Sequence, residues 1–456
     1  MSHASESSRW VPEIRDTLVL ATPVVITQVA QISMGFVDTV MVGRLGPEAL
    51  AGVALGSTVF YTLIVVCMGV VMAVGPMVSQ AFGAGDHATI GRSVRQGQWL
   101  AMILAIVFTL AIWNVEPALR LLGQSETNIA AAVSYLRAIV WGAFPFLGFV
   151  GLRGFVEGVS RPRPVMVIAF LGVFANIGLN WVLMYGKFGF PALGIVGTGI
   201  ASAMVFWLNF LALLIFVARE RDFRVFRLFS TLGRPDGHMF RQLFRIGWPI
   251  GGSLGIEASL FMVTVMMMGW VSTDSLAAHQ VAIQCASFTF MVPLGIGMAA
   301  SVRVGQAAGR GDLPGVRWAG RAALAVSTVY MSLAALAFWL VPRGIVGLYL
   351  DLSIPRNEPV VVLAVTLLQI AAVFQIFDGI QVTAAGALRG LKDTRVPMLI
   401  SVASYWIVGL TSGYGLGFTA SWGPPGLWWG LVLGLASAAI LLVFRFRRST
   451  SSARDA

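Results

Sequence analysis

The sequence predicts an all-α polytopic membrane protein, with twelve transmembrane helices in two pseudo-symmetric six-helix bundles. Three observations support this fold class: the composition, the spacing of apolar runs and an internal repeat. Of the 456 residues, 57% are hydrophobic and 11% are charged, whereas about a quarter of an average soluble domain is charged. The mean hydropathy of +0.83 therefore excludes a protein that faces water on all sides.

Apolar runs of about 20 residues recur along the whole chain, and each is long enough to cross about 30 Å of hydrocarbon as a helix. A transmembrane β-barrel would instead alternate over segments of about 10 residues. Charged residues and Gly/Pro positions separate the runs. The predicted spans are 16–43, 48–75, 91–114, 128–156, 164–186, 194–218, 243–269, 275–301, 316–341, 359–388, 396–418 and 425–444.

The basic residues give the orientation of these spans. With strict alternation across the membrane, 25 of the 31 Lys and Arg residues fall on one side. The positive-inside rule makes that side cytoplasmic and places both termini there. Topology thus accounts for the net charge of +11, and we expect no nucleic-acid partner. The first residues are polar and contain no apolar core, so we expect no cleavable signal peptide.

An internal repeat relates the two halves of the chain. At an offset of 226, MVGRLGPEALAGVALG (41–56) aligns without a gap with MMGWVSTDSLAAHQVA (267–282), and VSQAFGAGD aligns with VGQAAGRGD. At an offset of 232, EGVSRPRPVM aligns with RGLKDTRVPM. Because six is even, both copies enter the membrane with the same orientation, and sites in such proteins tend to lie near the midplane where the halves meet.

The repeat suggests a division of the chain into four parts. They are an N-terminal six-helix bundle (1–218), a cytoplasmic linker (219–242), a C-terminal six-helix bundle (243–446) and a cytoplasmic tail (447–456).

The motif G-x-G-D occurs at 83–86 and again at 309–312. A single copy would be compatible with an intramembrane aspartyl protease. Its presence in both halves, each time before an Arg-containing stretch, instead favours a glycine stop at a helix C-terminus.

Three carboxylates lie well inside predicted spans: Asp38 in the first, Glu257 in the seventh and Asp378 in the tenth. A charge at a helix centre costs about 2.5–3.5 kcal/mol on insertion scales. None has an acidic counterpart in the other repeat, where the aligned residues are Thr264, Gln31 and Phe146. A buried acid that is protonated or paired with a polar neighbour is one interpretation. The other, which we prefer within a bilayer, is a site for H⁺, Na⁺ or an organic cation.

Polar residues in nearby spans are candidates for the same site. Asn176 and Asn180 are four residues apart and so share one face of the fifth helix. Hydrogen bonding between helices and lining of a substrate cavity are both open to them. Gln31 and Gln284 are weaker candidates for that cavity. Glu157 abuts the basic RPRP turn, and we expect it at the membrane interface.

The chain contains no nucleotide-binding motif. A P-loop requires G-x-x-x-x-G-K-[ST], and neither of the two lysines, Lys187 and Lys392, lies in such a motif. The two cysteines form no C-x-x-C pair, so no zinc site is indicated. We therefore expect a secondary transporter without ATP, enzymatic activity or any cofactor besides a coupling ion.

Several motifs resemble those of the multidrug and toxic compound extrusion (MATE) family, in particular its bacterial NorM-like branch. They are DTVMVGRLGPEALAGVALG, LAAHQVAIQ, LRGFVEGVSRPRPVM, ALRGLKDTRVPM and the paired G-x-G-D loops. The resemblance covers essentially the whole chain. It implies two six-helix bundles that form a V-shaped cleft, in a monomer of the bacterial inner membrane surrounded by lipid. It further implies antiport, in which Na⁺ or H⁺ flows inward while cationic amphiphilic drugs leave.

The resemblance also implies roles for individual residues. Asp38 matches the first-helix aspartate that binds protons in several members. Glu257 and Asp378 match carboxylates tied to cation binding, and they are the residues that would bind Na⁺. In some Na⁺-coupled relatives an aromatic hydroxyl lies one turn before the tenth-helix aspartate, whereas here Phe374 occupies that position in the predicted substrate cavity.

Two other functions are compatible with a polytopic membrane protein. A lipid-precursor flippase of a related two-bundle fold would need a basic cavity to hold pyrophosphate. Here the predicted intramembrane charges are acidic and the arginines are predicted in cytoplasmic loops, which disfavours that alternative. An intramembrane protease would rest on G-x-G-D alone.

Overall fold

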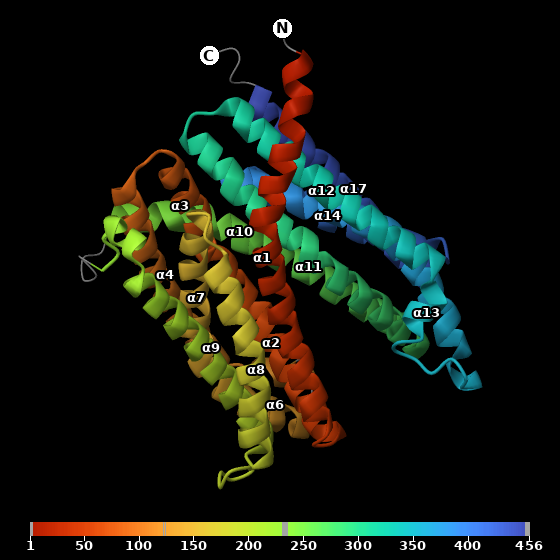
Figure 1. Ribbon diagram of the computed structural model, residues 1–456. Coiled ribbons are helices and arrows are strands. Elements are labelled where there is room, and N and C mark those ends of the chain that lie inside the picture. The colour runs from red at the N-terminus through yellow and green to blue at the C-terminus, as the bar shows by residue number, and fades with distance from the viewer. Residues whose placement is uncertain (1–2, 122, 124, 230–235, 452–456) are drawn as a thin grey trace. The chain divides into compact units, whose positions relative to one another are not determined.

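The computed structural model describes residues 3–121, 123, 125–229 and 236–451 (Figure 1), and every regular element in these residues is helical. Twelve helical segments of this part of the chain are long and apolar enough to cross a membrane. They are α1 (His3–Gly43), α2 with α3 (Pro47–Val71, Val74–Gly83), α4 (His87–Trp113), α6 with α7 (Glu126–Ile139, Ala143–Gly158), α8 (Arg163–Tyr185), α9 (Gly194–Arg219), α10 (Gly237–Val271), α11 (Thr273–Gly309), α12 (Leu313–Leu340), α14 (Glu358–Gly390), α15 with α16 (Arg395–Val402, Thr411–Tyr414) and α17 (Pro424–Ser451). Shorter elements complete the order: α5 (Glu116–Leu121), α13 (Pro342–Val346), the 3₁₀ turns η1 (Val140–Gly142), η2 (Arg221–Phe226) and η3 (Pro355–Asn357), and the π-helical stretches η4 (Ala403–Leu410) and η5 (Gly415–Thr419).

The twelve predicted spans are confirmed, but several helices continue past the predicted ends. The second span ends at Gly83 instead of residue 75, the eighth at Gly309 instead of 301, and the twelfth at Ser451 instead of 444. Hydrophobic length reports only the part of a helix that matches the hydrocarbon. Polar turns can therefore extend a helix beyond the limit that hydropathy indicates.

The helices pack into two units. Unit 1 comprises Met1–Val25 and Ile256–Ala456, and unit 2 comprises Ile26–Gly255. The first part of α1 therefore packs with the second repeat, and the first part of α10 packs with the first repeat. The predicted division at residues 218 and 243 stays a prediction. Parts of it, residues 230–235 of the linker and 452–456 of the tail, lie outside the described residues.

Glycines make this exchange of helix ends sterically possible. A Cβ at Gly69 of α2 would lie 2.5 Å from the Gly251 Cα of α10, within unit 2. The equivalent crossing in unit 1 joins Gly295 of α11 to Val25 of α1, where a Cβ at Gly295 would lie 2.5 Å from Val25 Cγ2. Both pairs are related by the repeat offset of 226. The repeat in sequence is therefore also a repeat in helix packing.

The two G-x-G-D loops have the same backbone geometry, as the helix-stop interpretation predicts. Gly85 and Gly311 both have φ of +72° directly after a helix, in the left-handed region that favours glycine. Asp86 and Asp312 then cap the next helices by accepting hydrogen bonds from Thr89 N and Gly315 N, each 2.9 Å. The turn geometry that the two halves share thus explains the motif without a catalytic aspartate.

Candidate functional site

Asp38 of α1 lies in unit 2, where three neutral side chains donate hydrogen bonds to its carboxylate. Asn176 Nδ2 and Asn180 Nδ2 of α8 donate to Oδ1 at 3.1 and 2.6 Å, and Ser202 Oγ of α9 donates to Oδ2 at 3.0 Å. The two asparagines have no exposed surface, and Ser202 is 2% exposed. The carboxylate is therefore held by three helices.

The local sequence explains how these donors converge. Residues four apart lie on one face of a helix, so Asn176 and Asn180 both face α1, and their predicted common face is confirmed. Helix α9 packs beside α8 and brings Ser202 to the other carboxylate oxygen. Nothing in the run GIASAM distinguishes Ser202 from the small residues that commonly pack between membrane helices.

Among the residues that the structure describes, no cationic side chain pairs with Asp38. Its described partners are neutral: Asn176, Asn180 and Ser202 by hydrogen bonds, and the phenols of Tyr61 and Tyr135 by electrostatic interaction. In the described residues no salt bridge involves Asp38, and the amide oxygens of the two asparagines accept no hydrogen bond. A negative charge beside spare acceptor oxygens in an apolar bundle is an arrangement that favours a proton or a small cation.

A second group of charges lies in unit 1. Asp378 of α14 is 5% exposed and Glu257 of α10 is half-buried. The two carboxylates interact electrostatically with each other, and Glu257 also interacts with Arg389 of α14. Tyr405 of η4 is buried and interacts with all three charged groups. The structure thus places Glu257 and Asp378 near each other and adds an arginine and a tyrosine to the group.

Each half has one arginine beside the pair of repeat-related positions 31/257 and 157/389, although the repeat does not align the two arginines with each other. Gln31 is equivalent to Glu257 at offset 226, and Glu157 to Arg389 at offset 232. In unit 2, Arg153 joins the equivalent pair by donating to Glu157 Oε1 at 2.7 Å and to Gln31 Oε1 at 3.4 Å. In unit 1, Glu257 and Arg389 interact electrostatically. Only the second half therefore sets an arginine against a predicted coupling acid.

Two arginines contradict a sequence-based prediction. Both are counted with the cytoplasmic loops in the charge analysis, but Arg153 lies inside α7 and Arg389 lies in the last turn of α14. Arg153 is 5% exposed and Glu157 is 3% exposed, and the expected position of Glu157 at the membrane interface stays a prediction. Charge counting alone misses such residues because an arginine near the end of an apolar run looks like a loop arginine. The i, i+4 spacing of Arg153 and Glu157 was the one available signal.

The structure does not bring the remaining predicted residues into either group. Phe374 is 1% exposed and packs in the core of unit 1, with ring centroids 5.6 Å from Trp428 and 6.2 Å from Phe261. Gln284 is exposed on α11. Gln31 faces Arg153. The predicted role of these residues in lining a substrate cavity stays a prediction.

A metal site would have few ligands here. Among the described residues, no group of three or more His, Cys, Asp and Glu side chains could hold a metal ion. Sodium bound by Glu257 and Asp378 would need neutral oxygen atoms to complete its coordination.

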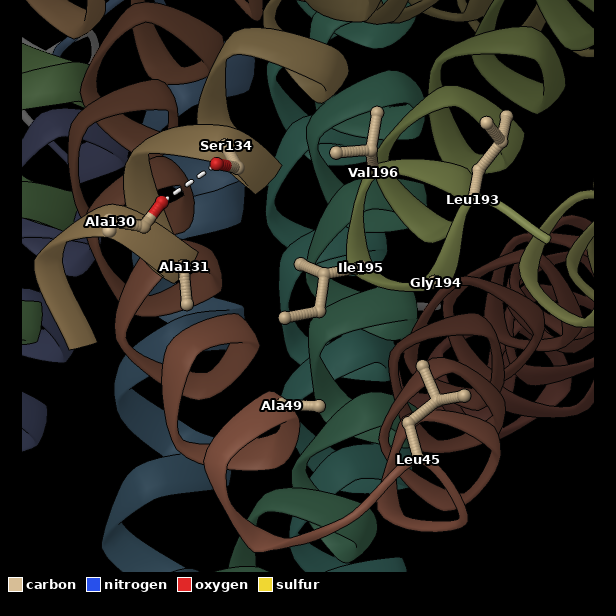
Figure 2. A pocket seen from close by; sticks show the side chains of 9 residues that line it. All are labelled: Leu45, Ala49, Ala130, Ala131, Ser134, Leu193, Gly194, Ile195 and Val196. Carbon is tan, nitrogen blue, oxygen red and sulfur yellow. Dashed lines mark hydrogen bonds between the residues drawn. The ribbon is translucent and has the colours of Figure 1, made fainter. Parts of the chain in front are cut away.

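A groove of about 520 Å³ opens at the ends of α2, α6 and α9 in unit 2 (Figure 2). Its lining is apolar: Leu45, Ala49, Ala130, Ala131, Ser134, Leu193, Gly194, Ile195 and Val196. The single hydroxyl, of Ser134, donates to Ala130 O of its own helix at 2.7 Å. The groove has no titratable group and contains none of the predicted site residues.

Known proteins resemble this chain over nearly its whole length. The family model MatE matches residues 23–182 and 249–414. The chain is 41% identical over 441 residues to "Probable multidrug resistance protein NorM" of Mesorhizobium japonicum, covering 96% of this chain and 94% of that protein. It is 40% identical over 445 residues to the protein of the same name from Pseudomonas aeruginosa, covering 98% and 91%.

Solved structures share the fold at lower sequence identity. The eukaryotic MATE transporter AtDTX14 superposes with a TM-score of 0.86 at 21% identity, covering 98% of this chain and 99% of that chain. An outward-facing multidrug resistance MATE family transporter of the MOP superfamily gives a TM-score of 0.89 at 19% identity, covering 97% of both chains. The sequence matches and the shared twelve-helix fold lead to one conclusion: the chain belongs to the MatE family.

Proposed function

We propose that this protein is a multidrug efflux transporter, a secondary antiporter that exports cationic amphiphilic compounds across the bacterial inner membrane in exchange for H⁺ or Na⁺. One observation carries the proposal. Asp38 is held inside a helical bundle by hydrogen bonds from three neutral side chains, its hydrogen-bond donors in the described part of the chain. A carboxylate in that position is stable when a mobile cation occupies it, and loss of that cation leaves an uncompensated charge.

The second charge group supports the same function. Glu257 and Asp378 lie near each other in unit 1. Among the described residues, Arg389 is the one arginine that interacts electrostatically with Glu257. When both acids are ionised, these three groups together carry one net negative charge. Such a group attracts a cation, and competition between a coupling cation and an organic cation for one carboxylate couples their two fluxes.

The charges argue less well for a lipid-precursor flippase. Pyrophosphate recognition needs basic groups that are free to bind an anion. Arg153 is paired with Glu157 at 2.7 Å, and Arg389 interacts with Glu257. Arg153 and Arg389 therefore each interact with an acid already, and the acids Asp38 and Asp378 remain.

The test is ethidium transport by purified protein in liposomes, with a Na⁺ gradient and a pH gradient imposed separately. One gradient or both should drive ethidium movement. Asp38→Asn, Glu257→Gln and Asp378→Asn should each reduce that movement by at least about tenfold, the effect of 1.4 kcal/mol. Asp274→Asn is the matched control, since Asp274 is an exposed acid at the start of α11.

Two results would count against the proposal. Ethidium movement that responds to neither gradient would exclude coupled antiport. Full gradient-driven transport by all three neutralised variants would show that these carboxylates do not bind the coupling ion.

A further inference from the structure

Arg153 of α7 is a buried charge that the proposed coupling sites do not include. The residue is 5% exposed, and its Nε donates to Glu157 Oε1 at 2.7 Å. Its Nη1 donates to two residues of α1, Gln28 Oε1 at 2.6 Å and Gln31 Oε1 at 3.4 Å. One guanidinium thus connects an acid on its own helix with two amides on another.

The Arg153–Glu157 pair is neutral as a unit. Glu157 lies one turn further along the same helix and is itself 3% exposed. The pair therefore differs from Asp38, which has no cationic partner among the described residues. Because both charges belong to α7, their attraction does not by itself hold two helices together. The bonds to Gln28 and Gln31 are the part of this network that reaches α1.

These bonds lie close to Asp38 along α1. Gln31 and Asp38 are seven residues apart, which is about two helical turns and roughly 10 Å of rise, so they lie on nearly the same side of the helix. Helix α1 is thus attached at two levels. Arg153 binds it at Gln28 and Gln31, and the donors from α8 and α9 bind it at Asp38.

A rigid segment between the two attachments transmits displacement. If α1 rotates or slides at Gln31, Asp38 moves with it, and hydrogen bonds weaken steeply once distance and angle depart from their optimum. We propose that Arg153 is a positioning residue for Asp38: by holding Gln28 and Gln31, it sets the rotation and depth at which α1 presents the Asp38 carboxylate to Asn180 and Ser202. This inference rests on the proposed coupling role of Asp38.

The experiment separates the bonds to α1 from the ion pair. The double variant Gln28→Leu/Gln31→Leu removes the α1 acceptors and keeps Arg153 with Glu157. The double variant Arg153→Gln/Glu157→Gln removes both charges together and leaves no unpaired one. Gln98→Leu is the matched control, because Gln98 Nε2 of α4 donates to Gly148 O of α7 at 3.1 Å and has no recorded contact with α1.

Two readouts are needed. The first is the rate at which a carbodiimide modifies Asp38 at fixed pH in purified protein, followed by peptide mass spectrometry. We expect both double variants to raise that rate about tenfold, since a tenfold change corresponds to the loss of about 1.4 kcal/mol of restraint. The second is liposome transport, where the coupling-ion concentration for half-maximal rate should change about tenfold and the KM for ethidium less than about twofold. Gln98→Leu should match the wild type in both.

The inference fails if Asp38 in a monodisperse Gln28→Leu/Gln31→Leu protein reacts with the carbodiimide at the wild-type rate and if transport keeps the wild-type ion dependence. Should the charge-pair variant not fold, the glutamine variant still decides. A wild-type protein without gradient-driven transport would defeat the proposed function instead, and the carbodiimide comparison would still test the link between Arg153 and Asp38.

Discussion

Asn180 donates a hydrogen bond of 2.6 Å to the carboxylate of Asp38, from α8 to α1. The two residues are 142 positions apart in the chain. A hydrogen bond to a charged group contributes about 1.5–3 kcal/mol. This contact is therefore strong enough to influence when Asp38 binds and releases a cation.

Removing that donor should impair transport without unfolding the protein. In Asn180→Ala, Asp38 keeps two donors but loses the shortest bond, and we expect gradient-driven ethidium transport to fall about tenfold. Asn114→Ala is the control. Asn114 caps the end of α4, and its Nδ2 donates to Leu110 O of that helix at 2.8 Å, so the variant loses an asparagine hydrogen bond away from Asp38. Equal transport by the two variants would show that the bond to Asp38 has no role in coupling.

The interaction between Glu257 and Arg389 should appear as a stability coupling. Arg389→Leu leaves Glu257 without its opposing charge, whereas Glu257→Gln/Arg389→Leu removes both charges, and replacing a whole pair is often nearly neutral. A loss of about 1–2 kcal/mol would lower the Tm of a unit of this size by roughly 2–8 °C. We expect that decrease in the single variant and a return toward the wild-type Tm in the double variant.

An exposed ion pair provides the comparison for the Glu257 and Arg389 variants. Arg343 pairs with Glu358 at 2.6 Å on the surface, and exposed pairs contribute about 0–1 kcal/mol. Arg343→Leu should therefore change the Tm of the purified protein very little. If Glu257→Gln/Arg389→Leu is as unstable as Arg389→Leu alone, the two charges do not depend on each other.

Replacing glycine by alanine should change the Tm in opposite directions at Gly69, where α2 crosses α10, and at Gly178 of α8. A Cβ at Gly69 would lie 2.5 Å from the backbone of Gly251, whereas a Cβ at Gly178 of α8 would have no atom within 4 Å. Alanine in an unobstructed helix interior is favoured over glycine by roughly 0.5–1 kcal/mol. Gly69→Ala should lower the Tm in detergent and Gly178→Ala should maintain or raise it. A Gly69→Ala protein as stable as the wild type would contradict the close approach of α2 and α10.

The cap at Asp86 predicts a pH-dependent contribution to stability. Hydrogen bonds from Thr89, to both carboxylate oxygens, lower the pKa of Asp86 below its ordinary value. A lowered folded-state pKa means that the contribution is present above the unfolded pKa of about 3.9 and is lost as the pH falls through the folded-state value. Asp86→Ala removes the cap, a loss of about 0.5–2 kcal/mol.

The measurement compares wild type and Asp86→Asn over a pH series. Asparagine retains an acceptor for the Thr89 N–H but carries no charge. The difference in Tm between the two proteins should be constant near neutral pH and shrink at pH values below about 4. A difference that stays constant through that range would mean that the charge of Asp86 does not stabilise the start of α4.

Hydropathy and repetition determined much of this protein without any structure. The twelve spans, the helix stops at G-x-G-D and the common face of Asn176 and Asn180 depend on neighbours within a few turns. Such features are local, and their periods of 3.6 residues or about 20 residues can be read along the chain. Asp38, Glu257 and Asp378 stood out for a similar reason: a carboxylate in an apolar run is unusual wherever the chain folds.

Tertiary packing decided which of these residues meet. Ser202 binds Asp38 across 164 positions and Arg153 binds Gln31 across 122, and no local pattern marks either partner. The sequence counts Arg153 and Arg389 with the loops because each lies near the end of an apolar run. Packing also assigned α1 up to Val25 to unit 1 and α10 up to Gly255 to unit 2. The local hydropathy of the sequence reports how favourably each stretch enters lipid. Which helices pack together depends instead on shape and on hydrogen bonds between helices far apart in the chain.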